Sequence, residues 1–481
     1  MKSSQIGPSL SRIVKCQVLW DSQTRNLYSV DASSYILKPQ VVTFPRNELD
    51  VVKIIKFAKK HCIQITPRGA GAGLVGSALG KGIILDMKYF DDIKIGDGYV
   101  NVGSGVFKGH LDKILQFKNK FIGPDPSIGP YCTIGGMIGT NASGIHSLKY
   151  GSMIDNLIQI KMVNSSGVVV KLPNNHDFNR VIKKIHSDQD ISFPKVSKNS
   201  CGYRIDRVSS EKDIHKLIVG SEGTLGIITS AKVRTYRLPK NIILYIIHYK
   251  TLQEAVRDVP KINELRPSAV EIADNNITKH IKINTPSRTG CLLFVEFDST
   301  IQASKKIHKI TSGVIIRIES NKERIKKIWL FRNSALAYSL QSLSKNEIMP
   351  NLIEDAVVPV KRLPLLLSLL EMVSKKYGFK IIIYGHAGNG NLHIMSILKQ
   401  RDTHLIKKIA FEFFSGVISI GGSISAEHGD GLARSEFVKM QYNKKTYNMF
   451  RYIKKQFDPK NILNPGKIIS NQSTVTRNLR I

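Results

Sequence analysis

Three glycine-rich segments in the N-terminal half constrain the fold of this chain more than any other feature. They read PRGAGAGLVG (residues 67–76), TIGGMIGTNASG (133–144) and GSEGTLGIIT (220–229). Glycine lets the backbone N–H groups of a loop converge on a ligand without obstruction by side chains, and such an arrangement suits the oxygen atoms of a diphosphate. We therefore expect three loops that hold one long ligand from several sides.

The first of these segments contains GAGLVG (71–76), which matches the G-x-G-x-x-G pattern of Rossmann nucleotide sites and follows a predicted strand, CIQIT (62–66). A Rossmann site needs a helix that begins inside the loop, because the helix N-terminus binds the pyrophosphate. Here the loop continues as SALGKG into a second predicted strand, GIILDM (82–87), which leaves no room for a crossover helix. This disfavours a nicotinamide-dependent dehydrogenase with a Rossmann domain.

The charge of the chain raises the possibility that it binds nucleic acid. Its 481 residues, enough for two or three domains, carry a formal net charge of +34 at pH 7. Lysines occur singly or in pairs along nearly the whole sequence, without a block of five or more like charges, which disfavours a nucleic-acid-binding protein. A basic surface suits small acidic substrates or a peripheral position on the inner face of a membrane.

Cysteine and apolar residues indicate the compartment. The five cysteines are far apart and form no C-x-x-C pair, so the sequence shows no iron–sulfur or structural zinc motif. No apolar run approaches the ~18–20 residues that cross a bilayer. Both features predict a cytoplasmic protein in a reducing environment.

Local patterns place the remaining elements. PRNELDVVKIIKFAKKHC (45–62) is predicted to be an amphipathic helix capped by Asn47. From the strand NIILYIIHY (241–249) to about residue 430, helical and strand patterns alternate, which predicts an α+β domain. The segment FDPKNILNPGKI (457–468) is expected to return toward a site in the first domain.

The glycine segments, taken with GPDPSIGPYC (123–132) and KYGSMIDN (149–156), resemble the successive FAD-binding segments of the vanillyl-alcohol-oxidase/PCMH flavoprotein family. The order and spacing of motifs are most similar to the branch of D-lactate dehydrogenase, the glycolate oxidase FAD subunit and D-2-hydroxyglutarate dehydrogenase. The resemblance implies an α+β fold with a PCMH-type FAD-binding domain, a substrate (cap) domain and a C-terminal segment that returns to the FAD site. The implied boundaries are an N-terminal segment (1–36), the FAD-binding domain (37–239), the cap domain (240–430) and the C-terminal segment (431–481).

The same resemblance implies the residues that bind FAD. They are Arg68, Gly69, Ala70, Gly71, Ala72, Gly73, Leu74 and Gly76 at the diphosphate, then Asp125, Pro126, Thr133, Gly135, Gly136, Thr140, Asn141 and Gly144 along the adenosine and isoalloxazine, and Glu222, Gly223 and Ile228 closing the site. Ala72 stands where this branch usually has threonine and where covalent relatives have the histidine that links the flavin. FAD is therefore expected to be bound non-covalently.

A metal site is implied in the cap domain. GHAGNGNLH (385–393) is similar to the branch's metal-binding segment, which implies His386, His393 and Glu427 as ligands of a divalent metal, zinc before manganese or iron. Taken alone, the two histidines are equally compatible with a glycine turn on the surface. The resemblance also implies His428 as the general base and Asn391 as a substrate contact.

Two further positions bear on the metal and on the substrate. Asn389 replaces an aspartate that relatives usually carry, and we expect the loss of this carboxylate to weaken metal binding or to alter the histidine orientation. IWLFRNSA (328–335) is similar to the family's tryptophan–arginine segment, which implies Arg332 as the clamp on the substrate carboxylate.

The expected reaction is the oxidation of a D-2-hydroxy acid, D-lactate or glycolate, to the 2-oxo acid with hydride transfer to flavin N5. Electrons would then pass to a quinone, a cytochrome or a partner subunit. A D-2-hydroxyglutarate dehydrogenase is the alternative, although the lysine that binds its second carboxylate is not evident near IEDAVVP (353–359).

Overall fold

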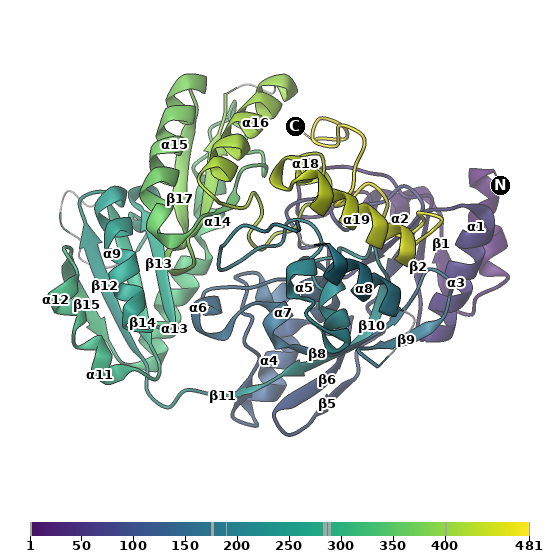
Figure 1. Ribbon diagram of the computed structural model, residues 1–481, viewed down its shortest axis with the longest axis horizontal. Coiled ribbons are helices and arrows are strands. Elements are labelled where there is room, and N and C mark those ends of the chain that lie inside the picture. The colour runs from purple at the N-terminus through teal and green to yellow at the C-terminus, as the bar shows by residue number, and fades with distance from the viewer. Residues whose placement is uncertain are drawn as a thin grey trace.

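Three main sheets organise the chain, which Figure 1 shows as a computed structural model. The structure describes residues 2–174, 178–188, 190–281, 286, 290–399 and 402–480. Two sheets lie in the N-terminal half and a third, of seven strands, lies beside them in the C-terminal half. This arrangement agrees with the predicted α+β fold.

The first sheet has four strands in the order β1-β2-β4-β3, of which β2, β4 and β3 run parallel. Helix α3 (Glu48–His61) packs its apolar side on this sheet. The Asn47 side chain caps α3 by accepting a hydrogen bond from the N–H of Asp50, as predicted. The other elements here are α1 (Ser3–Ser11), β1 (Gln17–Leu19), α2 (Ser22–Leu27), β2 (Val41–Phe44), β3 (Ile65–Arg68) and β4 (Ile83–Asp86).

The first glycine segment lies in the loop between β3 and β4, which are parallel neighbours. Residues 69–82 are all described, and none of them is helical or in a strand. The predicted lack of a crossover helix is therefore confirmed. Strand β3 begins at Ile65 rather than at Cys62, because Cys62 ends α3 in the left-handed conformation (φ 54°).

The second sheet is antiparallel, with the order β5-β6-β10-β8-β9. A separate two-stranded pairing joins β7 to β11. The strands are β5 (Ile93–Ile95), β6 (Tyr99–Gly103), β7 (Lys120–Phe121), β8 (Leu157–Val163), β9 (Val169–Leu172), β10 (Ile227–Arg234) and β11 (Tyr236–Arg237). The helices are α4 (Lys108–Gln116), α5 (Ile134–Thr140), α6 (Ser147–Tyr150), α7 (Met153–Asn156) and α8 (Asn179–Ser187), with short 3-10 turns at Gly129–Tyr131, Ile205–Arg207 and Glu211–Leu217.

The prediction of a loop for the second glycine segment was wrong in its first half, which forms helix α5. Thr133 caps this helix by accepting a hydrogen bond from the N–H of Gly136. Ile134, Met137 and Ile138 recur at helical spacing and are buried, and this apolar face stabilises a helix despite three glycines. The third segment enters strand β10, as predicted.

The cap domain is built on an antiparallel sheet with the order β15-β12-β14-β13-β17-β18-β16. Helices α9, α15 and α16 pack on one face, and α13 and α14 on the other. The strands are β12 (Ile243–Tyr249), β13 (Ala269–Asp274), β14 (Cys291–Phe297), β15 (Val314–Glu319), β16 (Asp355–Val357), β17 (Lys380–His386) and β18 (Asn391–Ile397). The helices are α9 (Leu252–Glu264), α10 (Asn275–Thr278), α11 (Ile301–Ser304), α12 (Ile307–Ile310), α13 (Lys322–Asn333), α14 (Ala335–Gln341), α15 (Leu363–Tyr377) and α16 (Thr403–Ser419), with 3-10 turns at Val360–Arg362 and Ala387–Asn389.

The C-terminal segment crosses back over the N-terminal half, as Figure 1 shows for α19. Its helices are α17 (Gly431–Arg434), α18 (Val438–Gln441) and α19 (Lys444–Phe457). Beyond them, residues 462–464 lie along the free edge of β3, where the N–H of Ile65 donates to the carbonyl of Ile462 and the N–H of Asn464 donates to the carbonyl of Ile65, both at 2.7 Å. The predicted return of this segment is confirmed.

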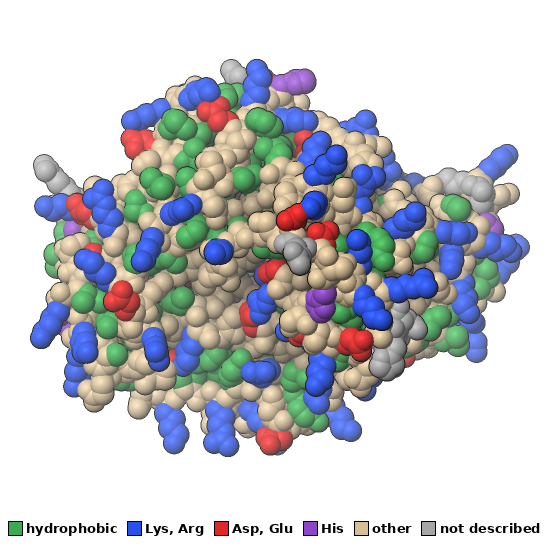
Figure 2. Space-filling view, in the orientation of Figure 1, with side chains coloured by type: hydrophobic (Ala, Val, Ile, Leu, Met, Phe, Trp, Pro, Cys, Tyr) green, Lys and Arg blue, Asp and Glu red, His purple; other side chains and the backbone are tan. Residues whose placement is uncertain are grey.

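The visible surface carries many basic side chains (Figure 2), as expected from the net positive charge of the chain. In Figure 2, lysine and arginine side chains are spread over the whole visible face, with acidic side chains scattered between them. The described part of the chain contains no helix long and apolar enough to cross a membrane.

Candidate active site

The two histidines of GHAGNGNLH lie on the hairpin formed by β17 and β18. His386 pairs with Asn391 across the hairpin and Tyr384 pairs with His393, so both imidazoles lie on the same sheet face. The turn is tight at Gly390 (φ 74°), where an added Cβ would meet the carbonyl of Val358. The ring nitrogens Nε2 of His386 and His393 are 3.3 Å apart. The hairpin thus brings the two imidazoles together.

Glu427 reaches the same point from the loop that follows α16. Its Oε1 lies 3.0 Å from His386 Nε2 and 3.4 Å from His393 Nε2. A metal ion bonded to three tetrahedral ligands at about 2.1 Å holds them about 3.4 Å apart. The three donor atoms therefore have the mutual spacing that a divalent metal requires.

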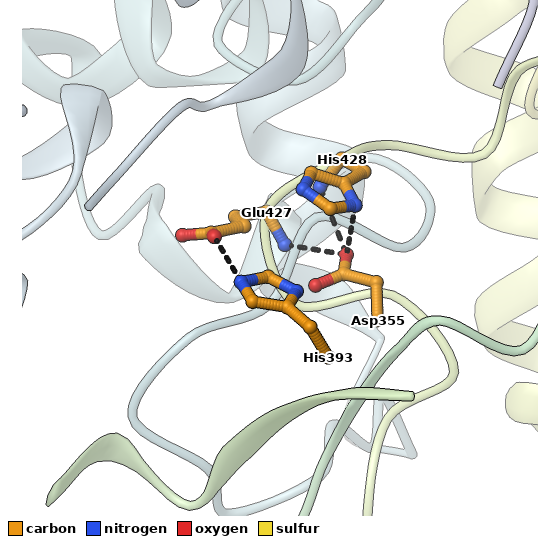
Figure 3. A group of neighbouring side chains, drawn as sticks. All are labelled: Asp355, His393, Glu427 and His428. Atoms are coloured by element: carbon orange, nitrogen blue, oxygen red, sulfur yellow. Dashed lines mark hydrogen bonds and ion pairs between the residues drawn. The ribbon is translucent and has the colours of Figure 1, made fainter. Parts of the chain in front are cut away.

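The loop that carries Glu427 and His428 is held by Asp355 at the start of β16. Asp355 Oδ2 accepts hydrogen bonds from the N–H groups of Ala426, Glu427 and His428, each at 2.9 Å. Figure 3 shows Asp355 beside His428, with His393 facing Glu427. Ligand atoms of these four residues lie within 4.8 Å of one another. This group includes Asp355 in place of His386; because Asp355 Oδ2 already accepts from three N–H groups, His386 stays the predicted third ligand of a metal.

The protonation states at this centre suit a metal site. Burial lowers the pKa of His393 to about 4, which keeps its imidazole neutral. Burial opposes the ionisation of Glu427, but Lys198 and His386 hold the pKa of its carboxyl well below the ordinary value. The His393 imidazole and the Glu427 carboxylate are thus available in the states that coordinate metals.

Behind the histidines lies a buried carboxylate, Glu271 on β13. Its Oε1 lies 2.6 Å from Nδ1 of His386, and its Oε2 lies 2.5 Å from Nη2 of Arg332. Although burial opposes ionisation, Arg332 and His386 lower the pKa of Glu271 to about 2. A carboxylate that accepts from Nδ1 fixes the ring so that Nε2 faces the metal position.

The Asn389 side chain makes no hydrogen bond to either histidine, and the effect on metal binding expected of this position stays a prediction. Its side chain accepts a hydrogen bond from Ser147 Oγ at 3.1 Å and donates to Ser197 Oγ at 3.3 Å, and both serines belong to the FAD-binding half. The carboxylate that orients His386 is Glu271. Asparagine at position 389 therefore joins the two halves and does not orient a histidine.

His428, the predicted base, is held by a second buried carboxylate. Its Nδ1 lies 3.1 Å from Glu354 Oε1, and Arg434, fully buried, pairs with Glu354 Oε2. This contact directs Nδ1–H to Glu354 and leaves Nε2 as the free ring nitrogen. Burial disfavours the charged ring, but Asp355 and Glu354 outweigh it and raise the pKa of His428 to about 9. A divalent cation nearby would lower this pKa toward the range of a base.

The predicted substrate contacts flank this centre. Arg332 is buried, and the Cζ of its guanidinium lies 5.4 Å from the centroid of the Tyr384 ring. Its Nε has no hydrogen-bond partner among the described residues. Asn391 Nδ2 donates to Asp355 Oδ1 at 3.3 Å and to the carbonyl of Ala356 at 3.0 Å. Its Oδ1 is buried and without a partner in the described chain. Both residues thus keep polar atoms for a ligand, and their roles stay predictions.

Two side chains from the FAD-binding half complete the surroundings of Glu427. Lys198 Nζ lies 2.8 Å from Glu427 Oε2, and Ser143 Oγ donates to the same oxygen. The site therefore forms at the boundary of the two halves.

The first glycine loop has the donors that a diphosphate needs. None of the backbone N–H groups of residues 69–78 donates a hydrogen bond to any residue that the structure describes. Gly71 (φ 68°) and Gly76 (φ 75°) adopt the left-handed conformation that glycine favours. A half-buried run of unpaired N–H groups fits the binding of an anion such as the FAD diphosphate.

The three glycine segments meet, as predicted. An added Cβ on Gly69 would contact Thr133, and one on Gly223 would contact Pro67. The N–H of Glu222 donates to the carbonyl of Gly139 at 2.8 Å. The N–H groups of Gly135 and Gly136 are occupied within the chain, by Ser104 and Thr133 respectively.

Several polar side chains predicted at the FAD site form hydrogen bonds within the protein, and their roles toward FAD stay predictions. Arg68 Nη2 donates to the carbonyl of Val30 at 2.8 Å, and Asn141 Oδ1 accepts from the N–H of Ile154 at 3.0 Å. Glu222 accepts from the N–H groups of Asp430 and Gly431. These side chains join segments of the protein, so contacts to FAD would come mainly from the backbone at these positions.

Other predicted cofactor residues surround α5. Asp125 accepts from His146, whose Nδ1 lies 2.5 Å from Asp125 Oδ2, and an added Cβ on Gly144 would meet the Asp125 carbonyl. Thr140 Oγ1 donates to the carbonyl of Gly136 at 3.2 Å. Ala70 is exposed, and Ala72, Gly73, Leu74 and Pro126 are half-buried, whereas Ile228 is buried.

Sequence reasoning missed five charged residues of the centre: Lys198, Glu271, Glu354, Asp355 and Arg434. One signal was present, because Glu271 interrupts the apolar strand AVEIAD and a charged residue is rarely buried there unless it has a partner. The others stand in segments of ordinary composition.

The comparisons with known proteins agree with this geometry. Residues 39–173 match an FAD binding domain, and residues 238–468 match the FAD linked oxidases, C-terminal domain. The chain is 28% identical to the glycolate oxidase subunit GlcD of Bacillus subtilis, over 93% of this chain and 92% of that protein. It is 28% identical to a D-lactate dehydrogenase of Archaeoglobus fulgidus, over 92% and 95%. It is also 28% identical to the D-2-hydroxyglutarate dehydrogenase of Escherichia coli, but spans only 49% of that longer protein.

Solved structures support the fold. An alkyldihydroxyacetonephosphate synthase superposes with a TM-score of 0.69 at 18% identity, covering 96% of this chain and 85% of the other. A BBE-like 1 variant of Physcomitrella patens superposes with a TM-score of 0.65 at 13% identity, covering 98% and 100%. With an FAD-binding domain followed by the oxidase C-terminal domain, the chain belongs to the family of FAD-linked oxidases, in the group of D-lactate, glycolate and D-2-hydroxyglutarate dehydrogenases.

Proposed function

We propose that this oxidoreductase converts a D-2-hydroxy monocarboxylic acid, D-lactate or glycolate, to the 2-oxo acid. Its proposed cofactors are non-covalently bound FAD and a divalent metal, for which zinc is the first candidate. When bound, FAD supplies the oxidant and the metal supplies a Lewis acid for the carboxylate and hydroxyl oxygens.

The observation that carries the proposal is the convergence of His386, His393 and Glu427 within 3.0–3.4 Å at the boundary of the FAD-binding half. An aliphatic alcohol needs its oxygens held and a proton removed before its α-hydrogen can leave as hydride. This centre offers a holding site and, in His428, an adjacent base whose ring lies 5.2 Å from that of His393.

The chain's own residues then act on the substrate. Arg332 would hold the carboxylate, and Asn391 Oδ1 would accept a hydrogen bond from the hydroxyl group. His428 Nε2 would take the hydroxyl proton, while Glu354 stabilises the resulting imidazolium through Nδ1, 3.1 Å away.

The preference for a monocarboxylate rests on the sequence, where a lysine for a second carboxylate is not evident near residues 353–359. The centre itself holds four buried carboxylates and three buried cations, and the raised pKa of His428 adds its imidazolium at neutral pH, so these charges balance without a metal. The carboxylates are Glu271, Glu354, Asp355 and Glu427, and the cations are Lys198, Arg332 and Arg434. A D-2-hydroxyglutarate substrate is the second candidate, favoured by relatives of that name.

Reduced FAD must pass its electrons onward. We propose a quinone, a cytochrome or an electron-transfer subunit as acceptor. The basic surface in Figure 2 would suit a peripheral position on the inner face of a membrane.

Anaerobic flavin bleaching tests the reaction. The purified protein is mixed with D- and L-lactate, glycolate and D-2-hydroxyglutarate, and the flavin absorbance is followed. We expect rapid bleaching by D-lactate or glycolate. Bleaching by D-2-hydroxyglutarate alone would favour the second candidate, and no bleaching by any of them would refute the proposed reaction.

A further inference from the structure

Lys198 lies in a segment of the FAD-binding half that is fixed on both sides. Ser197 Oγ donates to the carbonyl of Asn389 at 2.6 Å. Ser200 donates from its N–H to the carbonyl of Ser425 and from its Oγ to the carbonyl of Ala426, at 2.9 and 3.0 Å. The backbone at Lys198 is therefore held against both the histidine hairpin and the loop of Glu427.

The ammonium group of Lys198 is buried with few partners. Only 5% of the residue is exposed, and Glu427 Oε2 is the one acceptor of its Nζ among the described residues. An ammonium group has three N–H donors. Burial of charged donors without acceptors is costly, so the remaining N–H groups call for an acceptor that the protein does not supply.

Glu427 determines which acceptor fits. Its Oε1 faces the two histidines and its Oε2 faces Lys198, so the ammonium group and the two imidazoles share one carboxylate. An anionic acceptor suits the ammonium group best, because charge-assisted hydrogen bonds are the stronger ones. Arg332 differs in that it is already paired with Glu271 at 2.5 Å.

We propose, on the basis of the function proposed above, that Lys198 binds the carboxylate of the 2-hydroxy acid as a second cation beside Arg332. The alternative is that Lys198 only fixes Glu427 for metal binding. Ser143 separates the two roles, because it donates to the same carboxylate oxygen and carries no charge.

The experiment compares Lys198→Met and Lys198→Arg with Ser143→Ala. Exposed Lys195→Met in the same segment is the control for lysine loss. Each metal-loaded variant is checked for bound FAD by absorbance and for metal by elemental analysis. The dissociation constant of oxamate, a monoanionic substrate analogue, is measured from the perturbation of the flavin spectrum, and kcat and KM are measured with D-lactate and glycolate.

We expect Lys198→Met to weaken oxamate binding and to raise KM by about tenfold or more, at unchanged metal content. Lys198→Arg should recover most of the affinity, and Ser143→Ala and Lys195→Met should change it less than about threefold. Unchanged oxamate binding in Lys198→Met would overturn the proposal. An equal loss in Ser143→Ala, or a loss that excess metal restores, would also overturn it, since Lys198 would then act through Glu427.

Failure of this inference is distinguishable from failure of the proposed function. If the wild-type protein neither binds oxamate nor bleaches with any 2-hydroxy acid, the reaction is wrong. If the wild-type protein does both and Lys198→Met does so equally well, only the role of Lys198 is wrong. Should Lys198→Met lose FAD, Lys198→Gln provides the same comparison with a polar side chain.

Discussion

Replacing Glu271 by glutamine removes a negative charge that both His386 and Arg332 contact. The side chain is fully buried and lies 2.6 Å from His386 Nδ1 and 2.5 Å from Arg332 Nη2. Its pKa is lowered from the ordinary 4.5 to about 2. Because each pKa unit is about 1.4 kcal/mol, the ionised group stabilises the fold by about 3 kcal/mol. This contribution is present above about pH 4.5 and is lost as the pH falls toward 2.

At pH 7 we expect Glu271→Gln to cost about 3 kcal/mol, in line with the cost of breaking other buried ion pairs. For the cap domain this lowers the melting temperature by roughly 5–10 °C. We also expect metal affinity to fall about 10- to 100-fold, since the carboxylate no longer orients His386.

Thermal melts with and without a chelator separate the two effects, and elemental analysis reports the bound metal. Glu323→Gln, an exposed substitution near the start of α13, is the matched control and should leave both quantities unchanged. A Glu271→Gln protein with wild-type melting temperature and metal content would refute the assignment of Glu271 as the carboxylate behind the site.

Three further outcomes can be checked directly. His428→Ala should retain FAD and bind oxamate but lose at least about 100-fold in the rate of anaerobic flavin reduction, which stopped-flow absorbance measures; a wild-type rate would show that another group is the base. Asn389→Asp should leave metal affinity within about twofold, because residue 389 contacts Ser147 and Ser197 rather than a histidine, and a large gain in a metal titration would contradict this geometry. Acid precipitation should release all FAD into the supernatant, because Ala72 offers no group to link the flavin, and yellow colour in the pellet would contradict non-covalent binding.

Local motifs predicted the parts of the site that lie close together in sequence. The hairpin of His386 and His393 could be expected because seven residues with glycines between them span a tight turn. The first glycine loop was likewise predictable, since a second strand follows it too soon for a helix. The helix α5 was missed because glycine content suggested a loop, whereas buried Ile134, Met137 and Ile138 stabilise the helix.

The partners of these motifs could not be predicted, because they come from distant segments. Glu271 is 115 residues from His386, and Lys198 is 229 residues from Glu427. Asn389 shows the same limit, since the tertiary contacts of its side chain, rather than its neighbours in sequence, determine its role. Carboxylate and ammonium side chains in ordinary segments give no local sign of such pairing.

The strip of residues 462–464 along β3 has a consequence for how the protein matures. An unpaired parallel strand edge is a template for wrong pairing with other chains, and here its natural cover is made almost 400 residues after β3 itself. During synthesis this edge of the first sheet can be covered only after residues 462–464 have been made. A chain cut before residue 462 would leave the edge of β3 open to pairing with other chains.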